Sequence, residues 1–157
     1  MDRLTNYLNE YSESHQNKMN IVIHKICVPV IMFSAIGILK AMPVPEEWPL
    51  WLDLSYFAIL GVLIFYATLK NVKVFLAMVL FILLQVIILE LLRPHFFILC
   101  FFLFIVAWIF QFIGHKIEGK KPSFFKDLLF LLIGPIWVVK SIADQMGWKI
   151  LNNAKDT

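Results

Sequence analysis

The chain has 157 residues, of which 61% are hydrophobic and only 16% are charged, and its mean hydropathy is +0.79. Soluble domains contain about 45–50% apolar and about 25% charged residues, and a domain of this size leaves roughly 30% of its unfolded-chain surface in water. The composition therefore excludes a disordered chain, a soluble enzyme of average composition and a typical nucleic-acid-binding protein. It indicates an all-α integral membrane protein that forms one domain over residues 1–157.

Four apolar runs have the length of membrane-spanning helices, and they cover residues 21–41, 50–69, 74–92 and 96–114. A span needs about 20 predominantly apolar residues, and short connections between such runs favour an antiparallel bundle. The polar segment before the first run predicts an interfacial helix. A shorter apolar run at residues 128–139 carries Gly134-Pro135 in its middle, which predicts a broken helix that lies on the membrane or re-enters it.

The distribution of basic residues predicts the orientation in the membrane. Four spans place the N-terminal arm, the connection at residues 70–73 and the segment after Gly114 on one side, and this side carries most of the Lys and Arg residues. The other side holds only Lys40 and Arg93. Because basic loops stay in the cytoplasm, we expect both termini there, in a bacterial inner membrane or, in a eukaryote, the endoplasmic reticulum.

The first polar cluster lies where the first span begins. Asn17, Asn20 and His24 follow helical spacing and share one face. His15 precedes His24 by nine positions, which is the opposite side of a continuous helix. If both histidines bind one ligand, the helix must begin between them. The candidate N-caps for such a start are Ser12, Ser14 and Asn17.

The second polar cluster lies where the fourth span ends. Gln111, His115 and Glu118 follow i, i+4, i+7 spacing, and Gly114 lets a neighbouring group approach His115 closely. The order of the spans places both clusters at the same membrane surface. It places His95 at the other surface, roughly 30 Å away.

Three converging imidazoles suggest a metal site formed by His15, His24 and His115. Imidazole suits zinc, copper, iron and nickel, so the donor type leaves the metal open. Glu118 or the nearby amide side chains are candidate acceptors for the second N–H of a ligating histidine. Two alternatives remain open. One is a non-catalytic lipid-binding or assembly protein whose histidines join helices, and the other is a zinc hydrolase with Glu118 as general base.

The two clusters also carry a family resemblance. The segment at residues 11–29 contains H-x-N-x-x-N-x-x-x-H followed by Val28-Pro29, and residues 108–122 read WIFQFIGHKIEGKKP. Both segments, in this order and separated by three apolar runs, resemble the signatures of the Mpo1-like family over nearly the whole chain. One departure is that Ser123 follows Pro122, where the family often has alanine.

The resemblance implies an Fe(II)-dependent dioxygenase that uses O₂ to shorten 2-hydroxy fatty acids by one carbon, as in breakdown of a sphingolipid long-chain base. It implies that His15, His24 and His115 hold Fe(II). The supporting catalytic residues would be Glu118, Asn17, Asn20 and Gln111, and the residues that attract or bind the substrate head would be Tyr11, Lys116, Lys120 and Lys121. Membrane lipid is the expected surrounding, and no nucleic-acid partner is expected.

Overall fold

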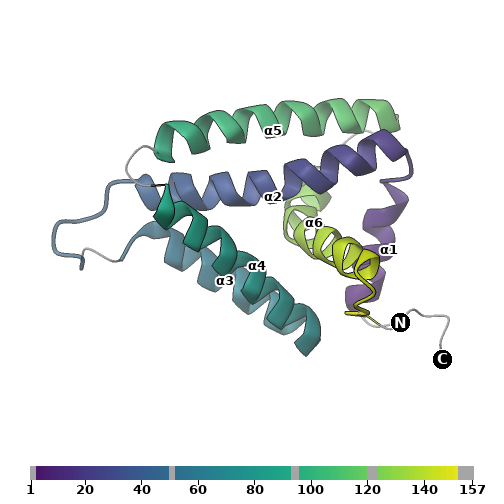
Figure 1. The fold of residues 1–157 in the computed structure, drawn as a ribbon, viewed down its shortest axis with the longest axis horizontal. Helices are drawn as coiled ribbons and strands as arrows, with labels where there is room; N and C mark the ends of the chain where they lie inside the picture. Colours follow the sequence, from purple (N-terminus) through teal and green to yellow (C-terminus); the bar gives the residue numbers. More distant parts are fainter. Residues whose placement is uncertain (1–2, 50–51, 93–95, 120–123, 152–157) are drawn as a thin grey trace.

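A computed structural model describes residues 3–49, 52–92, 96–119 and 124–151, and every regular element in these ranges is a helix. The helices are α1 (Arg3–Glu13), α2 (Lys18–Ala41), α3 (Leu54–Thr68), α4 (Val72–Leu91), α5 (Phe96–Glu118) and α6 (Phe124–Gln145). The prediction of an all-α fold is therefore confirmed for the described part of the chain. Figure 1 shows the helices arranged as a long pair, a hairpin and a terminal pair.

The long pair consists of α2 and α5, which run antiparallel and side by side (Figure 1). Two glycines mark where the helices approach most closely. A Cβ atom on Gly37 would overlap Sγ of Cys100, and one on Gly114 would overlap Oδ1 of Asn20. Small residues allow such close packing between membrane helices. The pair thus brings the first turns of α2 beside the last turns of α5.

The hairpin consists of α3 and α4 and diverges from the long pair (Figure 1). Lys70 adopts a positive φ of 54° in the turn, and the Asn71 side chain caps α4 by accepting from the Val74 amide at 3.0 Å. Asp53 caps α3 by accepting from the Ser55 amide at 2.9 Å. The short connection produces the antiparallel neighbours that the sequence predicts.

The terminal pair, α1 and α6, packs at the end of the molecule where α2 begins (Figure 1). Leu4, Leu8 and Tyr11 follow helical spacing along α1 and are buried, so α1 has one apolar face. The indole N–H of Trp137 in α6 donates to Oγ of Ser12 at 3.0 Å, just before α1 ends. This bond joins the two helices beside the first polar cluster.

The predicted break at Gly134-Pro135 is wrong, because α6 is one continuous helix over Phe124–Gln145. Proline removes a backbone donor from the helix, but neighbouring side chains can satisfy carbonyls near it. The Tyr66 hydroxyl donates to the Leu132 carbonyl at 3.0 Å, which is next to the Leu131 carbonyl whose helical donor Pro135 removes, and ties this turn of α6 to α3. Pro29 lies inside α2 in the same way. That α6 lies on or re-enters the membrane stays a prediction.

Three helices are long and apolar enough to cross a membrane: Lys18–Ala41, Val72–Leu91 and Phe97–Glu118. They coincide with the first, third and fourth predicted spans. The second forms α3, which has 15 residues and is therefore about 22 Å long, less than the roughly 30 Å of a hydrocarbon core. The length of α3 leaves the predicted count of four spans unconfirmed.

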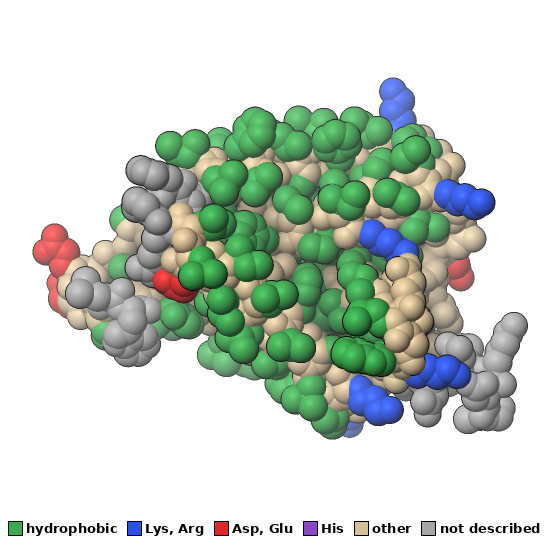
Figure 2. Space-filling model, in the orientation of Figure 1, with side chains coloured by type: hydrophobic (Ala, Val, Ile, Leu, Met, Phe, Trp, Pro, Cys, Tyr) green, Lys and Arg blue, Asp and Glu red, His purple; other side chains and the backbone are tan. Residues whose placement is uncertain are grey.

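The surface agrees with an apolar surrounding. In Figure 2, hydrophobic side chains cover most of the face formed by α4 and α5, and Phe102, for example, is 63% exposed. On the same face, the visible Lys and Arg side chains gather in the half of the molecule that holds the N-terminus, the turn between α3 and α4 and the end of α5 (Figure 2). This distribution supports the predicted orientation, which stays a prediction.

Candidate metal centre

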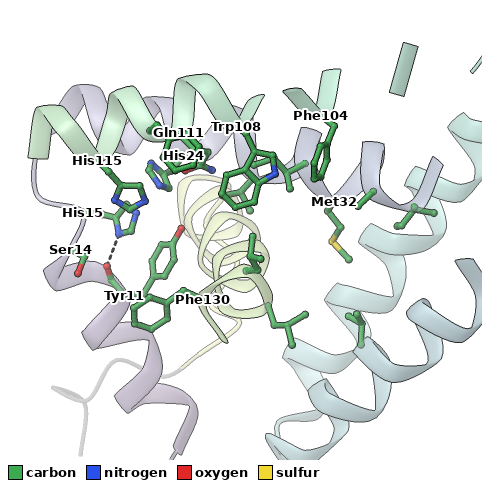
Figure 3. A pocket seen from close by; sticks show the side chains of 18 of the residues that line it. Tyr11, Ser14, His15, His24, Met32, Phe104, Trp108, Gln111, His115 and Phe130 are labelled. Carbon is green, nitrogen blue, oxygen red and sulfur yellow. Dashed lines mark hydrogen bonds between the residues drawn. The ribbon is translucent and has the colours of Figure 1, made fainter. Parts of the chain in front are cut away.

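Helix ends bring the three predicted histidines together. His15 lies between α1 and α2, His24 lies in the second turn of α2, and His115 lies near the end of α5. The Asn17 side chain caps α2 by accepting from the Met19 amide at 2.9 Å, so a new helix starts between His15 and His24, as the spacing requires. Figure 3 shows the three imidazoles around one space.

The geometry of this histidine cluster (His15, His24 and His115) is that of a possible metal site. One nitrogen from each imidazole can be chosen so that all three lie within 4.8 Å of one another. The ring centroids of His24 lie 4.2 Å from His15 and 4.9 Å from His115. His15 and His24 are only 4% and 2% exposed. His95 lies outside the described residues, so its predicted separation is not observed.

The hydrogen bonds of two rings select the tautomer that a metal needs. Nδ1 of His15 donates to the Tyr11 carbonyl at 2.6 Å, and Nδ1 of His24 donates to the Asn20 carbonyl at 3.0 Å. A carbonyl only accepts, so the proton of each ring resides on Nδ1 and the lone pair resides on Nε2. Ligating histidines commonly donate their other N–H in this way. The donor set therefore fits a metal ion.

Glu118 holds the start of α2. Its Oε1 accepts from the Gln16 amide at 2.9 Å, and its Oε2 accepts from the Asn17 amide at 3.0 Å and from Nδ2 of Asn20 at 2.9 Å. A carboxylate is stabilised at a helix N-terminus because it accepts from N–H groups that have no partner in the helix. The carboxylate thus couples the end of α5 to the segment that carries His15 and His24.

The other predicted residues divide into two groups. Gln111 is buried and lines the space beside the histidines together with Tyr11 (Figure 3). Asn17 is the cap of α2, and Asn20 is fully buried between α2 and α5, where it binds Glu118. The predicted basic residues do not join them: Lys116 is exposed, and Lys120 and Lys121 lie outside the described residues.

A cavity of about 580 Å³ extends from the histidine cluster between α2, α3, α5 and α6. Its polar lining lies at the histidine end, and the remainder is apolar. On α2 the lining runs along one face from His24 to Leu39, which corresponds to about 22 Å of helix. The apolar lining consists of Val28, Ile31, Met32, Ala35, Ile36, Leu39, Ala58, Ile59, Val62, Phe104, Trp108, Phe112, Phe130, Leu131 and Leu132, with the Tyr66 ring beside them.

The polar end of the cavity carries acidic rather than basic side chains. Among the described lining residues there is no Lys or Arg, whereas Glu10 and Glu13 both line it. A carboxylate that entered this end without a cation would be repelled. A bound metal ion at the histidine cluster would supply the missing positive charge.

Tyr11 is held by contacts that the sequence does not reveal. Its ring stacks on His15 with centroids 4.1 Å apart and meets Phe130 of α6 edge-on at 5.4 Å. A Cβ atom on Gly134 would lie 3.0 Å from the Tyr11 hydroxyl, so this glycine provides room for the phenol instead of breaking α6. Burial raises the pKa of Tyr11 above its usual value, which keeps the hydroxyl protonated as a donor.

A polar cluster that the sequence does not reveal lies at the other end of α2. Nζ of Lys40 lies 2.9 Å from Oδ2 of Asp53 and 2.7 Å from Oε1 of Glu90, and the Lys40 side chain is only 5% exposed. This lysine cluster (Lys40, Asp53 and Glu90) joins α2 to α4 and to the cap of α3. Its members are far apart in sequence, so no local spacing signals the contact.

Comparison with known proteins gives an independent result. The family model described as "2-hydroxy-palmitic acid dioxygenase Mpo1-like" matches residues 1–146. A Saccharomyces cerevisiae protein named 2-hydroxy-palmitic acid dioxygenase MPO1 is 31% identical over 149 residues, which cover 92% of this chain and 82% of that protein. No solved structure matches the chain.

Proposed function

Because the chain belongs to the Mpo1-like family, we propose that it is a membrane-embedded, Fe(II)-dependent dioxygenase of 2-hydroxy fatty acids. One observation carries the proposal: three imidazole nitrogens lie within 4.8 Å of one another at the polar end of a long apolar cavity. This arrangement suits an amphipathic substrate whose polar head reacts at a metal. We place the site at the cytoplasmic face, in line with the positive-inside pattern.

His15, His24 and His115 would hold the iron through one nitrogen each. Iron held by imidazoles is suited to redox chemistry with O₂, and three protein ligands leave further positions for the substrate. The backbone carbonyls of Tyr11 and Asn20 keep the rings of His15 and His24 in the required tautomer. The protein thus contributes the ligands and their orientation, with His15 and His24 buried.

The substrate would lie along the cavity with its carboxylate and 2-hydroxyl groups at the histidine cluster. Tyr11, Ser14 and Gln111 line this end and have side chains that can donate a hydrogen bond to those oxygens. The acyl chain would follow α2 through the apolar part of the cavity, where burial of each methylene stabilises the complex by about 0.8 kcal/mol. The polar end of the cavity therefore matches the head of the substrate, and the apolar part matches its acyl chain.

The reaction needs no external reductant. A 2-hydroxy acid and O₂ together contain the same atoms as the acid one carbon shorter, CO₂ and water. The bond between the carboxyl carbon and the 2-carbon breaks, the 2-carbon is oxidised to the new carboxyl group, and O₂ is reduced. This balance fits a chain whose only proposed cofactor is Fe(II).

The geometry favours this function over a zinc hydrolase. A hydrolase of that type requires a general base beside the metal-bound water, and the sequence offers Glu118. Both oxygens of Glu118 already accept from N–H groups at the start of α2, and Glu118 is not among the described residues that line the cavity. A non-catalytic role would not require three histidine nitrogens to converge.

The test is O₂ consumption by purified protein loaded with Fe(II) in detergent or lipid. We expect O₂ uptake with a 2-hydroxy fatty acid, formation of the acid one carbon shorter, and no uptake with the non-hydroxylated acid of equal length. Elemental analysis after purification without chelators should find about one iron per chain. Absence of O₂ uptake with 2-hydroxy acids of every length, despite bound iron, would refute the proposal.

A further inference from the structure

We propose that the end of the cavity opposite the histidine cluster determines the longest acyl chain that the protein accepts, through Ala35 and Leu39 of α2 and Ala58 of α3. This inference rests on the proposed function, because it takes the substrate head to lie at the histidines. It concerns the other end of the same cavity, where the methyl end of the substrate would lie.

The cavity has a direction and a defined extent along α2. Lining residues recur on one face of that helix from His24 through Val28 and Ala35 to Leu39, so the tail follows a path of about 22 Å parallel to the helix axis. Beyond Val28 this face of α2 contributes only apolar side chains to the described lining. When the substrate head lies at the histidine cluster, the length of the acyl chain therefore determines which residues of α2 its methyl end reaches.

The path ends because charged and tightly packed groups follow it. Lys40, the residue after Leu39, is buried in its ion pairs with Asp53 and Glu90. A methyl group that advanced further would have to separate charges that are costly to leave unpaired. On the side facing α5, a Cβ atom on Gly37 would overlap Sγ of Cys100, so no space remains there. The lysine cluster thus lies immediately beyond the apolar path.

Two small side chains leave room just before this end. Ala35 and Ala58 line the cavity from different helices, and each could be replaced by a larger apolar side chain that occupies space otherwise available to the tail. Leu39 offers the opposite change, because its replacement by alanine removes three carbons from the lining. The cavity can therefore be shortened from two helices and lengthened from one.

The experiment compares Ala58→Leu, Ala35→Leu and Leu39→Ala with the matched control Ala67→Leu. Ala67 lies on α3, is exposed and is not among the described lining residues. Two quantities are measured over a series of chain lengths. The first is O₂ uptake with 2-hydroxy acids by the iron-loaded protein. The second is displacement of a fluorescent fatty alcohol from the metal-free protein by saturated 1-alkanols, whose uncharged heads Glu10 and Glu13 do not repel.

Ala58→Leu and Ala35→Leu should lower the affinity and the O₂ uptake for the longest accepted chain, relative to shorter chains, by about tenfold or more. A pocket that is too short by one methylene discriminates by that amount. Leu39→Ala should shift the preference toward longer acids. Ala67→Leu should leave both profiles unchanged. The two alanine sites are independent, so a variant that does not fold leaves the other as the test.

Unchanged length profiles in the folded variants, or an equal shift in Ala67→Leu, would overturn the inference. The two proposals fail separately. A wild-type protein that oxidises no 2-hydroxy acid contradicts the proposed function, whereas the displacement assay on the metal-free protein still measures the length limit. If the protein is active but substitution of these residues does not change the longest acid that it accepts, only the inference is contradicted.

Discussion

Each end of α2 carries a polar cluster that contains at least one buried side chain, and the clusters differ in how their groups are satisfied. In the lysine cluster, opposite charges meet: Lys40 contacts Asp53 at 2.9 Å and Glu90 at 2.7 Å. In the histidine cluster, three groups of the same kind face one another within 4.8 Å. Burial and polarity are common to both. Opposite charges satisfy each other. Three imidazole nitrogens that converge need a further group that binds all of them, so of these two clusters only the histidine cluster indicates a ligand.

The clusters also differ in what they join. The lysine cluster connects α2, α4 and the cap of α3, and therefore ties the hairpin to the long pair. The histidine cluster connects α2, α5 and the segment between α1 and α2, with Tyr11 and α6 packed around it. We therefore expect changes at the lysine cluster to reduce stability and changes at the histidine cluster to reduce metal binding and activity.

The largest expected effect is that of His24→Ala. Loss of one of three proposed ligands should remove the metal and lower activity by at least about 100-fold. The fold should persist, because the ring packs at the end of α2 and the remaining helices keep their contacts. Elemental analysis and O₂ uptake measure the effect, and circular dichroism checks the fold. His95→Ala is the histidine control, and retention of full metal content by His24→Ala would contradict the proposed ligand set.

Lys40→Met should do the reverse of His24→Ala: it should lower stability and leave metal binding unchanged. Removal of the cation leaves the carboxylates of Asp53 and Glu90 without the ammonium group that both contact, which should lower the free energy of unfolding by about 1–2 kcal/mol. Metal content per folded chain should not change, because the lysine cluster lies at the opposite end of α2. Thermal unfolding in detergent and elemental analysis separate the two quantities. Loss of metal without loss of stability would show that the clusters are not distinct in role.

Gly114→Ala should reduce both stability and metal binding. Its Cβ atom would overlap Oδ1 of Asn20 and lie 3.4 Å from Cε1 of His24, so the helices must separate at the histidine cluster. We expect a loss of about 1–3 kcal/mol in stability together with weaker metal binding.

Two other glycines serve as matched controls for that substitution. Gly37→Ala should disturb the same helix pair at its other end, where Cys100 is the neighbour, and should leave metal affinity unchanged. Gly61→Ala should have little effect, since no atom lies within 4 Å of its added Cβ. Equal metal loss in Gly37→Ala and Gly114→Ala would mean that helix separation acts over the whole pair.

The smallest effect is expected for Glu118→Gln. The amide oxygen can still accept at one of the two positions, but the NH₂ group at the other position then faces an N–H donor, either that of Gln16 or those of Asn17 and Asn20. We expect about a tenfold loss of metal affinity, typical for residues that orient ligands, with activity recovered at high iron concentration. Iron titration of O₂ uptake measures this shift. Abolished activity at saturating iron would instead indicate a direct catalytic role for Glu118.

The histidine cluster could be predicted because span order determines which residues share a membrane surface, and helical spacing determines which share a face. The same reasoning located the start of a helix between His15 and His24. It failed at Gly134-Pro135, because Gly134 provides room for the hydroxyl of Tyr11, which is far away in sequence. It also missed the lysine cluster, because charge pairs between distant helices leave no periodic pattern. Local patterns thus predicted helices and helix ends, but not the contacts that cross between them.

The break between α1 and α2 has a consequence for how the molecule holds together. His15 and His115 are about 100 residues apart in the chain, so an ion bound to both would close a very long loop and act as a reversible cross-link. It would fasten the end of α1 to the end of α5, with α6 packed against α1 through Trp137 and Ser12. A bound ion would then stabilise the docked N-terminal segment by mass action, beyond what the apolar contacts of α1 already provide.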